Sequence, residues 1–296
     1  MCDETTQREL GQYLQKKALT RRTFAAGASA ALAVPSVSAA TPKYAREYLA
    51  QMAVLVPTPE GNIDGVFFHP KDGAHAAIIF WPDVHGVRPA HFEMARRLAS
   101  HGYAVLAVNP YYRTHTGQLF YNGMRYGDPG ARELVAPHYS AVSPKGVVID
   151  AKALVSWLDK QPAVDSARGI GAAGFCMTGS WALRAAAAVP ERIKAPCSFH
   201  GGGLVTDEAD SPHRLADKIS GGALIAIAEN DHSRQPGAKQ TLIDAFAAAK
   251  VPAEVEVYAD AMHGWVPTDS RAYHPEQAQR AWSRMLTVFD AQLGVR

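Results

Sequence analysis

Three residue types that together support nucleophilic catalysis occur along this chain, each shortly after a predicted strand. They are Cys176, Asp231 and His263, in the order nucleophile, acid and base. In such an arrangement His263 would accept the thiol proton, and Asp231 would hold the histidine tautomer and stabilise the imidazolium. A lone histidine is more often structural, but a Cys, an Asp and a His at three matching strand ends predict covalent catalysis through a cysteine.

The nucleophile stands in a predicted strand-to-helix turn. A small apolar run ends at Phe175, an Ala- and Leu-rich run begins at Ser180, and Cys176 lies between them. A nucleophile at the apex of such a turn is a nucleophile elbow, and flanking glycines leave room for its strained backbone. The N-terminus of the following helix would lower the thiol pKa and help to hold an oxyanion. Because the turn departs from G-x-S-x-G at Cys176 and Thr178, a buried structural cysteine is the alternative interpretation.

The elements that must position these residues alternate between strand and helix patterns. Strands are expected at Val54–Pro57, Ile63–His69, Ala76–Trp81, Tyr103–Asn109, Gly169–Phe175, Ala195–His200, Ala223–Ala228 and Val255–Tyr258. Helices are expected at Arg88–Ser100, Pro144–Lys160, Ser180–Val189, Gln235–Lys250 and Pro275–Leu293. This alternation predicts a single α/β domain over 41–296, with a doubly wound, mostly parallel sheet, helices on both faces and an antiparallel hairpin at one edge. The irregular segment Tyr111–Ser143 is expected to fold over a site at the carboxyl ends of the strands.

The chain resembles the dienelactone hydrolases, which are carboxymethylenebutenolidase-type members of the α/β-hydrolase fold. The motifs that carry the resemblance are Pro82–Gly86, Gly102–Pro110, Gly174–Cys176, Asp231 and His263. The resemblance covers most of residues 53–293. It implies the α/β-hydrolase fold and a Cys-His-Asp triad made of Cys176, His263 and Asp231.

The resemblance also implies roles in the loop after the first long parallel strand. Asp83 takes the position of a carboxylate, normally Glu in the family, that helps to activate the thiol once substrate binds. By position, the backbone N–H groups of Met177 and Val84 would form the oxyanion hole. Members that hydrolyse dienelactone clamp its carboxylate with arginines, one of them four residues after the triad histidine, where this chain has Pro267.

The candidate substrate-binding residues are His85, Arg113 and Trp265. Arg113 could supply a cation from the irregular segment, with Arg132 as the alternative. His200 opens an H-G-G-G run that is similar to a lipase-type oxyanion loop. Because that loop precedes the nucleophile in lipases and this run follows it, we interpret His200 as a structural residue near the site.

The first forty residues predict a twin-arginine signal peptide. The twin-arginine pattern Thr20–Phe24 precedes a run of small, weakly apolar residues, Ala25–Val37, and a small-residue cleavage region, Val37–Ala40. The run is too short and too poor in Leu and Ile for a transmembrane helix, so no stable membrane insertion is expected. We expect export by the twin-arginine machinery and a periplasmic or secreted location. An amphipathic N-terminal helix with a chance arginine pair is the alternative.

Composition narrows the class of protein further. The 296 residues are 47% hydrophobic and 20% charged, as in an ordinary globular protein, and the net charge of +2 shows no nucleic-acid footprint. No Gly-rich phosphate loop or GxGxxG pattern follows the first strand, and no histidines fall at metal-ligand spacing, so neither a cofactor nor a metal is expected. Cys197 lies in an apolar run and is interpreted as a core residue.

Together these features predict a cofactor-free hydrolase of ester bonds. The expected substrate is a small lactone, and the expected intermediate is an acyl-thioester on Cys176. A general esterase or thioesterase acting on another small substrate is the alternative within the same class. The third hypothesis is a non-catalytic protein of the same fold that only binds its ligand.

Overall fold

The computed structural model describes residues 8–13, 15 and 41–294. Its strands are β1 (Leu49–Thr58), β2 (Gly61–Pro70), β3 (Ala77–Trp81), β4 (Ala104–Val108), β5 (Ile170–Phe175), β6 (Ile193–Phe199), β7 (Ala223–Ala228) and β8 (Ala253–Tyr258). Its longer helices are α2 (Pro89–Ser100), α3 (Ala131–Ser140), α4 (Pro144–Leu158), α5 (Gly179–Ala188), α7 (Ala238–Ala248) and α8 (Pro275–Leu293). Short helices are η2 (Arg46–Tyr48), η3 (Cys176–Thr178), η4 (Pro212–Lys218) and α6 (Glu229–Arg234). The predicted twin-arginine pattern and the apolar run after it lie outside the described residues.

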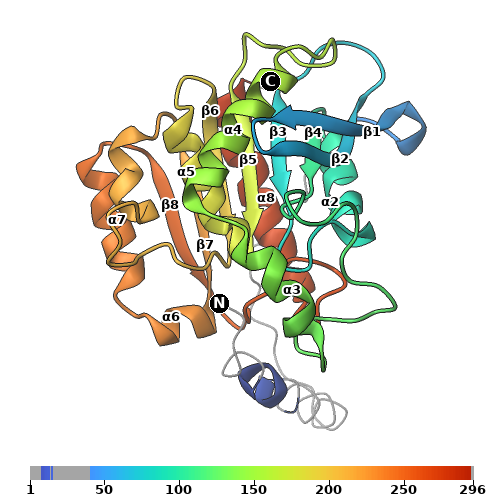
Figure 1. Ribbon diagram of the computed structural model, residues 1–296. Coiled ribbons are helices and arrows are strands. Elements are labelled where there is room, and N and C mark those ends of the chain that lie inside the picture. Colours follow the sequence, from blue (N-terminus) through green and yellow to red (C-terminus); the bar gives the residue numbers. More distant parts are fainter. Residues whose placement is uncertain (1–7, 14, 16–40, 295–296) are drawn as a thin grey trace, which may run out of the picture.

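The strands form one mixed sheet in the order β1-β2-β4-β3-β5-β6-β7-β8 (Figure 1). β1 and β2 make an antiparallel hairpin at one edge, and β2 is also antiparallel to β4. All other neighbouring strands, from β4 through β8, are parallel. The carboxyl ends of β3, β5, β7 and β8 therefore meet at one edge of the sheet, where open α/β sheets bind their ligands.

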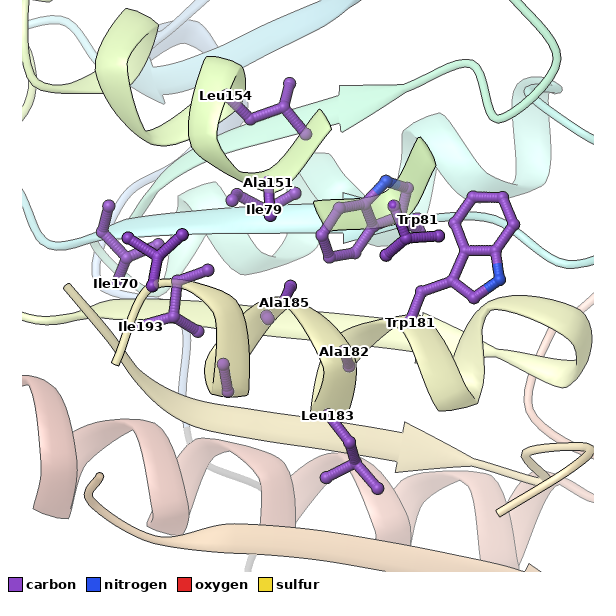
Figure 2. Packing of buried hydrophobic residues seen from close by; sticks show 14 of the residues in the cluster. Ile79, Trp81, Ala151, Leu154, Ile170, Trp181, Ala182, Leu183, Ala185 and Ile193 are labelled. Carbon is purple, nitrogen blue, oxygen red and sulfur yellow. The ribbon is translucent and has the colours of Figure 1, made fainter. Parts of the chain in front are cut away.

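The central strands are buried on both faces, which is why they are apolar throughout. Successive side chains of a strand point to opposite faces, so Ile79 of β3 joins the cluster that includes α4, α5 and α7, whereas Ile78 joins the cluster that includes α2 and α8. Figure 2 shows the first cluster, in which Trp81 of β3 meets Trp181 of α5 edge to face, with ring centroids 6.5 Å apart. Each fully buried large apolar side chain stabilises such a core by about 1.5–3 kcal/mol.

The predicted fold class is confirmed, with all eight strands and all five expected helices present. The α-helices α3 and α6 were not expected. α3 carries Pro137 in its interior, and α6 has only six residues, all of them polar, so neither shows an apolar repeat that a helix signal requires. Within the described part of the chain, no helix is long and apolar enough to cross a membrane.

Candidate active site

The turn after β5 has the geometry of a nucleophile elbow. Cys176 has a φ of 55°, in the left-handed region that costs a non-glycine residue on the order of 1–3 kcal/mol. Glycines on both sides permit this turn, since a Cβ on Gly174 would lie 2.0 Å from the Thr178 carbonyl oxygen and one on Gly179 would lie 2.5 Å from Gly201 Cα. The strained backbone presents Cys176 at the point where η3 and α5 begin.

Thr178, the departure from the usual glycine pattern, ties this elbow to the neighbouring loop. Its Oγ1 accepts a hydrogen bond from the Phe175 N–H at 2.8 Å and lies 2.8 Å from the Pro82 carbonyl oxygen, to which it donates. Thr178 is completely buried. The hydroxyl therefore holds the turn after β5 against the turn after β3, a role that the sequence pattern did not reveal.

Cys176, His263 and Asp231 come together in a hydrogen-bonded row. Cys176 Sγ lies 3.1 Å from His263 Nε2, and His263 Nδ1 donates to Asp231 Oδ2 at 2.6 Å. The backbone N–H of His263 donates to Asn230 Oδ1 at 2.8 Å, so α6 holds both the backbone and the ring of this histidine. These distances are those required for a base to take a proton from a nucleophile and for an acid to orient that base.

The charges around His263 favour its protonated form. Burial by itself would lower the pKa of His263, but the Asp231 carboxylate and the negative charge of Cys176 raise it to about 10. For Asp231 the two effects have the opposite sign. Burial would raise its pKa, but the nearby His263 holds this pKa below its ordinary value. An imidazolium between a carboxylate and a thiol stabilises the thiolate, which is the reactive form of cysteine.

His200, at the end of β6, packs against the triad instead of joining it. Its ring meets that of His263 edge to face, with centroids 4.9 Å apart, and it also contacts Trp265. Burial and the charge of His263 lower the pKa of His200 to about 3, so its ring is neutral. A neutral ring here adds no positive charge that would compete with protonation of His263.

Asp83 is held by Arg88 in the loop after β3. Arg88 Nη1 and Nη2 donate to the two Asp83 oxygens at 2.8 and 3.0 Å, and the other side of the guanidinium binds Asp269. Burial would raise the pKa of Asp83, but the charge of Arg88 keeps it well below its ordinary value. In this state Asp83 is an ionised anchor for Arg88 and for its own loop, and its role in activating the thiol stays a prediction.

The predicted substrate residue His85 links this loop to the irregular segment. Its Nε2 accepts a hydrogen bond from the Tyr126 N–H at 3.0 Å, so in the neutral ring the proton is on Nδ1, which lies 3.0 Å from Asp83 Oδ1. His85 also lines the cavity described next. It therefore joins the loop after β3 to the covering segment.

Cys176 and His263 line a cavity of about 310 Å³, whereas Asp231 is not part of its lining. Cys176, Asp83, Val84, His85, His200 and His263 line it from the strand ends. Gln118, Phe120 and residues 123–127 line it from the irregular segment, which folds over the site. Asp269, Ser270, Arg271 and Ala272 line it from the loop before α8. The volume suits a small organic molecule.

Two predicted substrate residues lie outside this lining. Arg113 binds Asp150 through Nη1 and Nη2, at 3.0 and 2.8 Å, and also pairs with Glu60. Trp265 is completely buried and stacks on Tyr258. Both side chains are committed to the fold, Arg113 beside α4 and Trp265 within the core.

Arginines other than Arg113 line the cavity. Among the described residues, the arginines that line the cavity are Arg88, Arg125 and Arg271. Arg132, the alternative cation, lies over the Tyr126 ring and is not part of the lining. Arg125 and Arg271 stand in segments with no periodic pattern, so the sequence held no signal that would place them at the site.

The N-terminal helical stretch over 8–13 reaches the same cavity. Leu10 is one of the residues that line it. Glu9 accepts a hydrogen bond from Asn230 Nδ2 at 3.0 Å and one from Arg234 Nη2, both on α6 beside Asp231. Part of the segment that is predicted to be removed therefore contributes to the lining of the cavity that Cys176 and His263 also line.

The structure describes no metal centre. Within the described ranges, no group of three or more His, Cys, Asp or Glu residues could hold a metal ion. Among the described residues, neither Cys176 nor Cys197 forms a disulfide, and Cys197 is completely buried in the core. Burial raises the pKa of Cys197, which keeps this second thiol protonated and unreactive.

An eight-stranded, mostly parallel sheet with an elbow cysteine after β5 defines the α/β-hydrolase fold, and a cysteine and a histidine are in contact at its strand ends. The chain belongs to the dienelactone hydrolase family, whose family model matches residues 63–293. The carboxymethylenebutenolidase of Rhodococcus opacus is 26% identical over 227 residues, which are 75% of this chain and 84% of that protein. A Salmonella typhi protein, provisionally described as a carboxymethylenebutenolidase, is 27% identical over 248 residues. The match covers 81% of this chain and 86% of that protein.

The solved structures agree on the fold. A crystal structure from Klebsiella pneumoniae, provisionally described as a dienelactone hydrolase, superposes with a TM-score of 0.69. It is 24% identical and covers 81% of this chain and 98% of its own. The predicted family and fold are thereby confirmed.

Proposed function

We propose that this protein hydrolyses a small carboxylic ester, preferentially a lactone, through an acyl-thioester on Cys176. The observation that carries the proposal is the row Cys176–His263–Asp231, of which Cys176 and His263 line a cavity that the irregular segment covers. Membership of a hydrolase family supports the same class of reaction.

The geometry supports a two-step reaction. The Cys176 thiolate attacks the carbonyl carbon, and the negative charge that develops on the carbonyl oxygen is held by the N–H groups of Val84 and Met177. As the tetrahedral intermediate collapses, the C–O bond breaks and the leaving oxygen takes the proton from the His263 imidazolium. Neutral His263 then takes a proton from water, the hydroxide attacks the thioester, and the acid leaves as the thiolate and imidazolium are restored.

The residues assigned to the oxyanion hole are in suitable places. Met177 follows the nucleophile in the first turn of η3, where N–H groups have no partner within the helix. Val84 lines the cavity from the loop after β3. The two loops are joined by Thr178, so the two N–H groups are kept in a constant relation to Cys176.

The nucleophile is tested by Cys176→Ala, with Cys197→Ala as the matched control. Cys176→Ala should abolish turnover of lactones, p-nitrophenyl esters and thioesters alike, whereas loss of the buried Cys197 thiol should leave it within a few-fold. Circular dichroism establishes that both variants are folded. A folded Cys176→Ala protein with undiminished turnover would refute the covalent mechanism.

The three substrate types separate the two hydrolase hypotheses. A preference for lactones supports the leading proposal, and a preference for open-chain esters or thioesters supports the general esterase. The non-catalytic alternative would turn over none of them.

Arg125, which lines the cavity, is the cation that we expect to attract a substrate carboxylate. Arg125→Gln should then raise KM for carboxylate-bearing substrates and leave KM for their neutral analogues unchanged.

We also propose that residues 1–40 direct export by the twin-arginine pathway, which would place the enzyme in the periplasm or outside the cell. The pattern Thr20–Phe24 and the following run of small residues support this proposal. A reporter fused after residue 40 should be exported, and Arg21→Lys with Arg22→Lys should stop its export. Unchanged export of the double variant would contradict the assignment.

A further inference from the structure

Tyr111 lies where the two predicted oxyanion-hole residues meet. Its side chain is 1% exposed and packs in a small cluster with Val84 and Cys176. The Tyr111 hydroxyl donates to the Val84 carbonyl oxygen at 2.7 Å and lies 3.6 Å from the Met177 sulfur. One buried hydroxyl therefore touches both residues whose N–H groups would receive the oxyanion.

The contact with Val84 completes a restraint on a whole peptide group. The carbonyl of the Val84–His85 peptide is held by Tyr111, and its N–H donates to Asp83 Oδ1 at 2.9 Å. Since a peptide group is planar, holding both ends sets its orientation and limits rotation about the Val84 backbone. Asp83, at the other side of Val84, is itself held by Arg88.

We propose that Tyr111 is a positioning residue for the oxyanion hole, whose hydroxyl keeps the Val84 N–H aimed at the carbonyl oxygen of the substrate. The inference rests on the proposed hydrolase function. Donors that are oriented before the reaction stabilise the developing charge without reorganising, so a loosened Val84 weakens the transition state more than the ground state.

The surroundings of Tyr111 keep its hydroxyl protonated, so that it can donate a hydrogen bond. The packing of its ring can be tested separately from this hydroxyl. Burial, reinforced by the negative charges of Asp83 and Cys176, holds the pKa of Tyr111 well above its ordinary value, so it remains protonated. The ring also fills the space beside Gly86, where a Cβ would lie 3.4 Å from it. Tyr111→Phe keeps this ring and removes only the hydroxyl.

The neighbouring residue provides a matched control. Tyr112 is also buried, and its hydroxyl donates to Asp150 at 2.6 Å on the side of the sheet that carries α4. Tyr112→Phe therefore removes a buried, hydrogen-bonded hydroxyl from the same loop without touching Val84 or Met177. Any general loss from a missing hydroxyl in this loop should appear in both variants.

The test combines turnover with two reactions of Cys176 that do not need turnover. Tyr111→Phe should lower kcat for p-nitrophenyl acetate by about tenfold to a hundredfold, with KM within twofold, because only transition-state stabilisation is lost. The affinity of the Tyr111→Phe variant for a small trifluoromethyl ketone, which forms a tetrahedral adduct with the thiolate, should fall by a similar factor. Alkylation of Cys176 by iodoacetamide forms no oxyanion, so its rate should be unchanged.

The outcomes are distinct. If wild type binds the ketone and hydrolyses esters but Tyr111→Phe matches Tyr112→Phe in kcat and ketone affinity, Tyr111 has no positioning role. A slower alkylation in Tyr111→Phe would also overturn the inference, since the loss would then lie in the thiolate. If wild type neither forms the ketone adduct nor turns over any ester, the proposed function itself fails and this inference fails with it.

Discussion

Asp83 is a buried carboxylate and Asp231 a half-buried one, both just after strands, and their partners give them different roles. Asp231 faces His263 and stabilises the protonated form of its ring. Asp83 instead faces Arg88, whose guanidinium stays protonated and charged. A carboxylate with a strongly lowered pKa is a weak base, so Arg88 opposes direct proton transfer from Cys176 to Asp83. Thiol activation by Asp83 would require this ion pair to open when substrate binds.

If substrate binding opens this ion pair, Asp83→Asn is expected to lower kcat by about a hundredfold or more, in the range for losing a general base, with a much smaller effect on KM. Steady-state kinetics measures this, provided that the melting temperature is unchanged. Asp269→Asn is the matched control, because it removes the other carboxylate on Arg88. If the two variants lose activity equally, Asp83 acts only through Arg88; if Asp83→Asn stays within a few-fold of wild type, Asp83 merely stabilises its turn.

The His263 ion pair predicts a pH dependence of stability. The pKa of His263 rises from 6.5 to about 10 on folding, so its contribution is fully present below about pH 6.5 and is lost as the pH rises through about 10. The lowered pKa of Asp231 acts in the other direction, with a contribution present above pH 3.8 and lost as the pH falls through the lowered value. The pair therefore stabilises the fold most at intermediate pH.

Thermal unfolding of wild type and His263→Asn at two pH values tests this. At about pH 7 the charged pair should contribute on the order of a few kcal/mol to the free energy of unfolding. The difference between the two proteins should shrink at about pH 10.5, where other titrating groups affect both equally. A difference that is constant across this range would show that His263 is neutral in the folded protein.

At the scale of elements, the site depends on how closely β5 and α5 approach their neighbours. The elbow needs two glycines because backbone atoms occupy the space that a Cβ would take. Thr178 and Arg88 then connect the elbow and the loop after β3 to segments far along the chain, Arg88 reaching Asp269 across 181 positions. Loops alone would not hold catalytic groups at hydrogen-bond distance, so these buried bonds do so.

Gly174→Ala should disrupt the elbow, because its methyl group would lie 2.0 Å from a backbone oxygen that cannot move aside. We expect the melting temperature to fall by several degrees, as for a loss of a few kcal/mol, and alkylation of Cys176 to lose its acceleration by His263. Gly237→Ala, at a position with nothing within 4 Å of the added Cβ, is the control and should be close to neutral. Equal stability of the two variants would mean that the turn tolerates a side chain.

At the scale of the whole molecule, the described N-terminal residues 8–13 meet the cavity that Cys176 and His263 line. Leu10 lines the cavity, and Glu9 binds α6 beside the triad acid. If the segment is removed on export, the processed protein has a more open site than the newly made chain. Location and activity would then be coupled through one segment.

A chain that begins at residue 41 should therefore react faster than the full chain. We expect iodoacetamide to alkylate Cys176 several-fold faster in the shortened protein, as followed by mass spectrometry of the Cys176 peptide, because Leu10 no longer shields the cavity. Glu9→Gln with Leu10→Ala in the full chain should reproduce much of the gain. Equal rates in all three proteins would show that the segment does not restrict access.

Local pattern was sufficient to predict the strands, five helices and the row of Cys176, Asp231 and His263. Each depends on a short run of residues, and a parallel sheet brings the residues after its strands to one edge whatever the details of packing. The tertiary structure alone placed Arg113 and Trp265 away from the cavity and put Arg125 and Arg271 in its lining.

The same division holds for Asp83, which the sequence by itself placed in the loop after a parallel strand. Only the fold shows three of its surroundings. Arg88 forms an ion pair with Asp83, Asp269 shares this arginine, and Tyr111 holds the next peptide group. Such contacts join residues from separate elements, and their energies depend on burial and on distances of a few tenths of an ångström. Sequence spacing determines which groups arrive at the sheet edge, whereas packing determines which of them pair and which are left for the substrate.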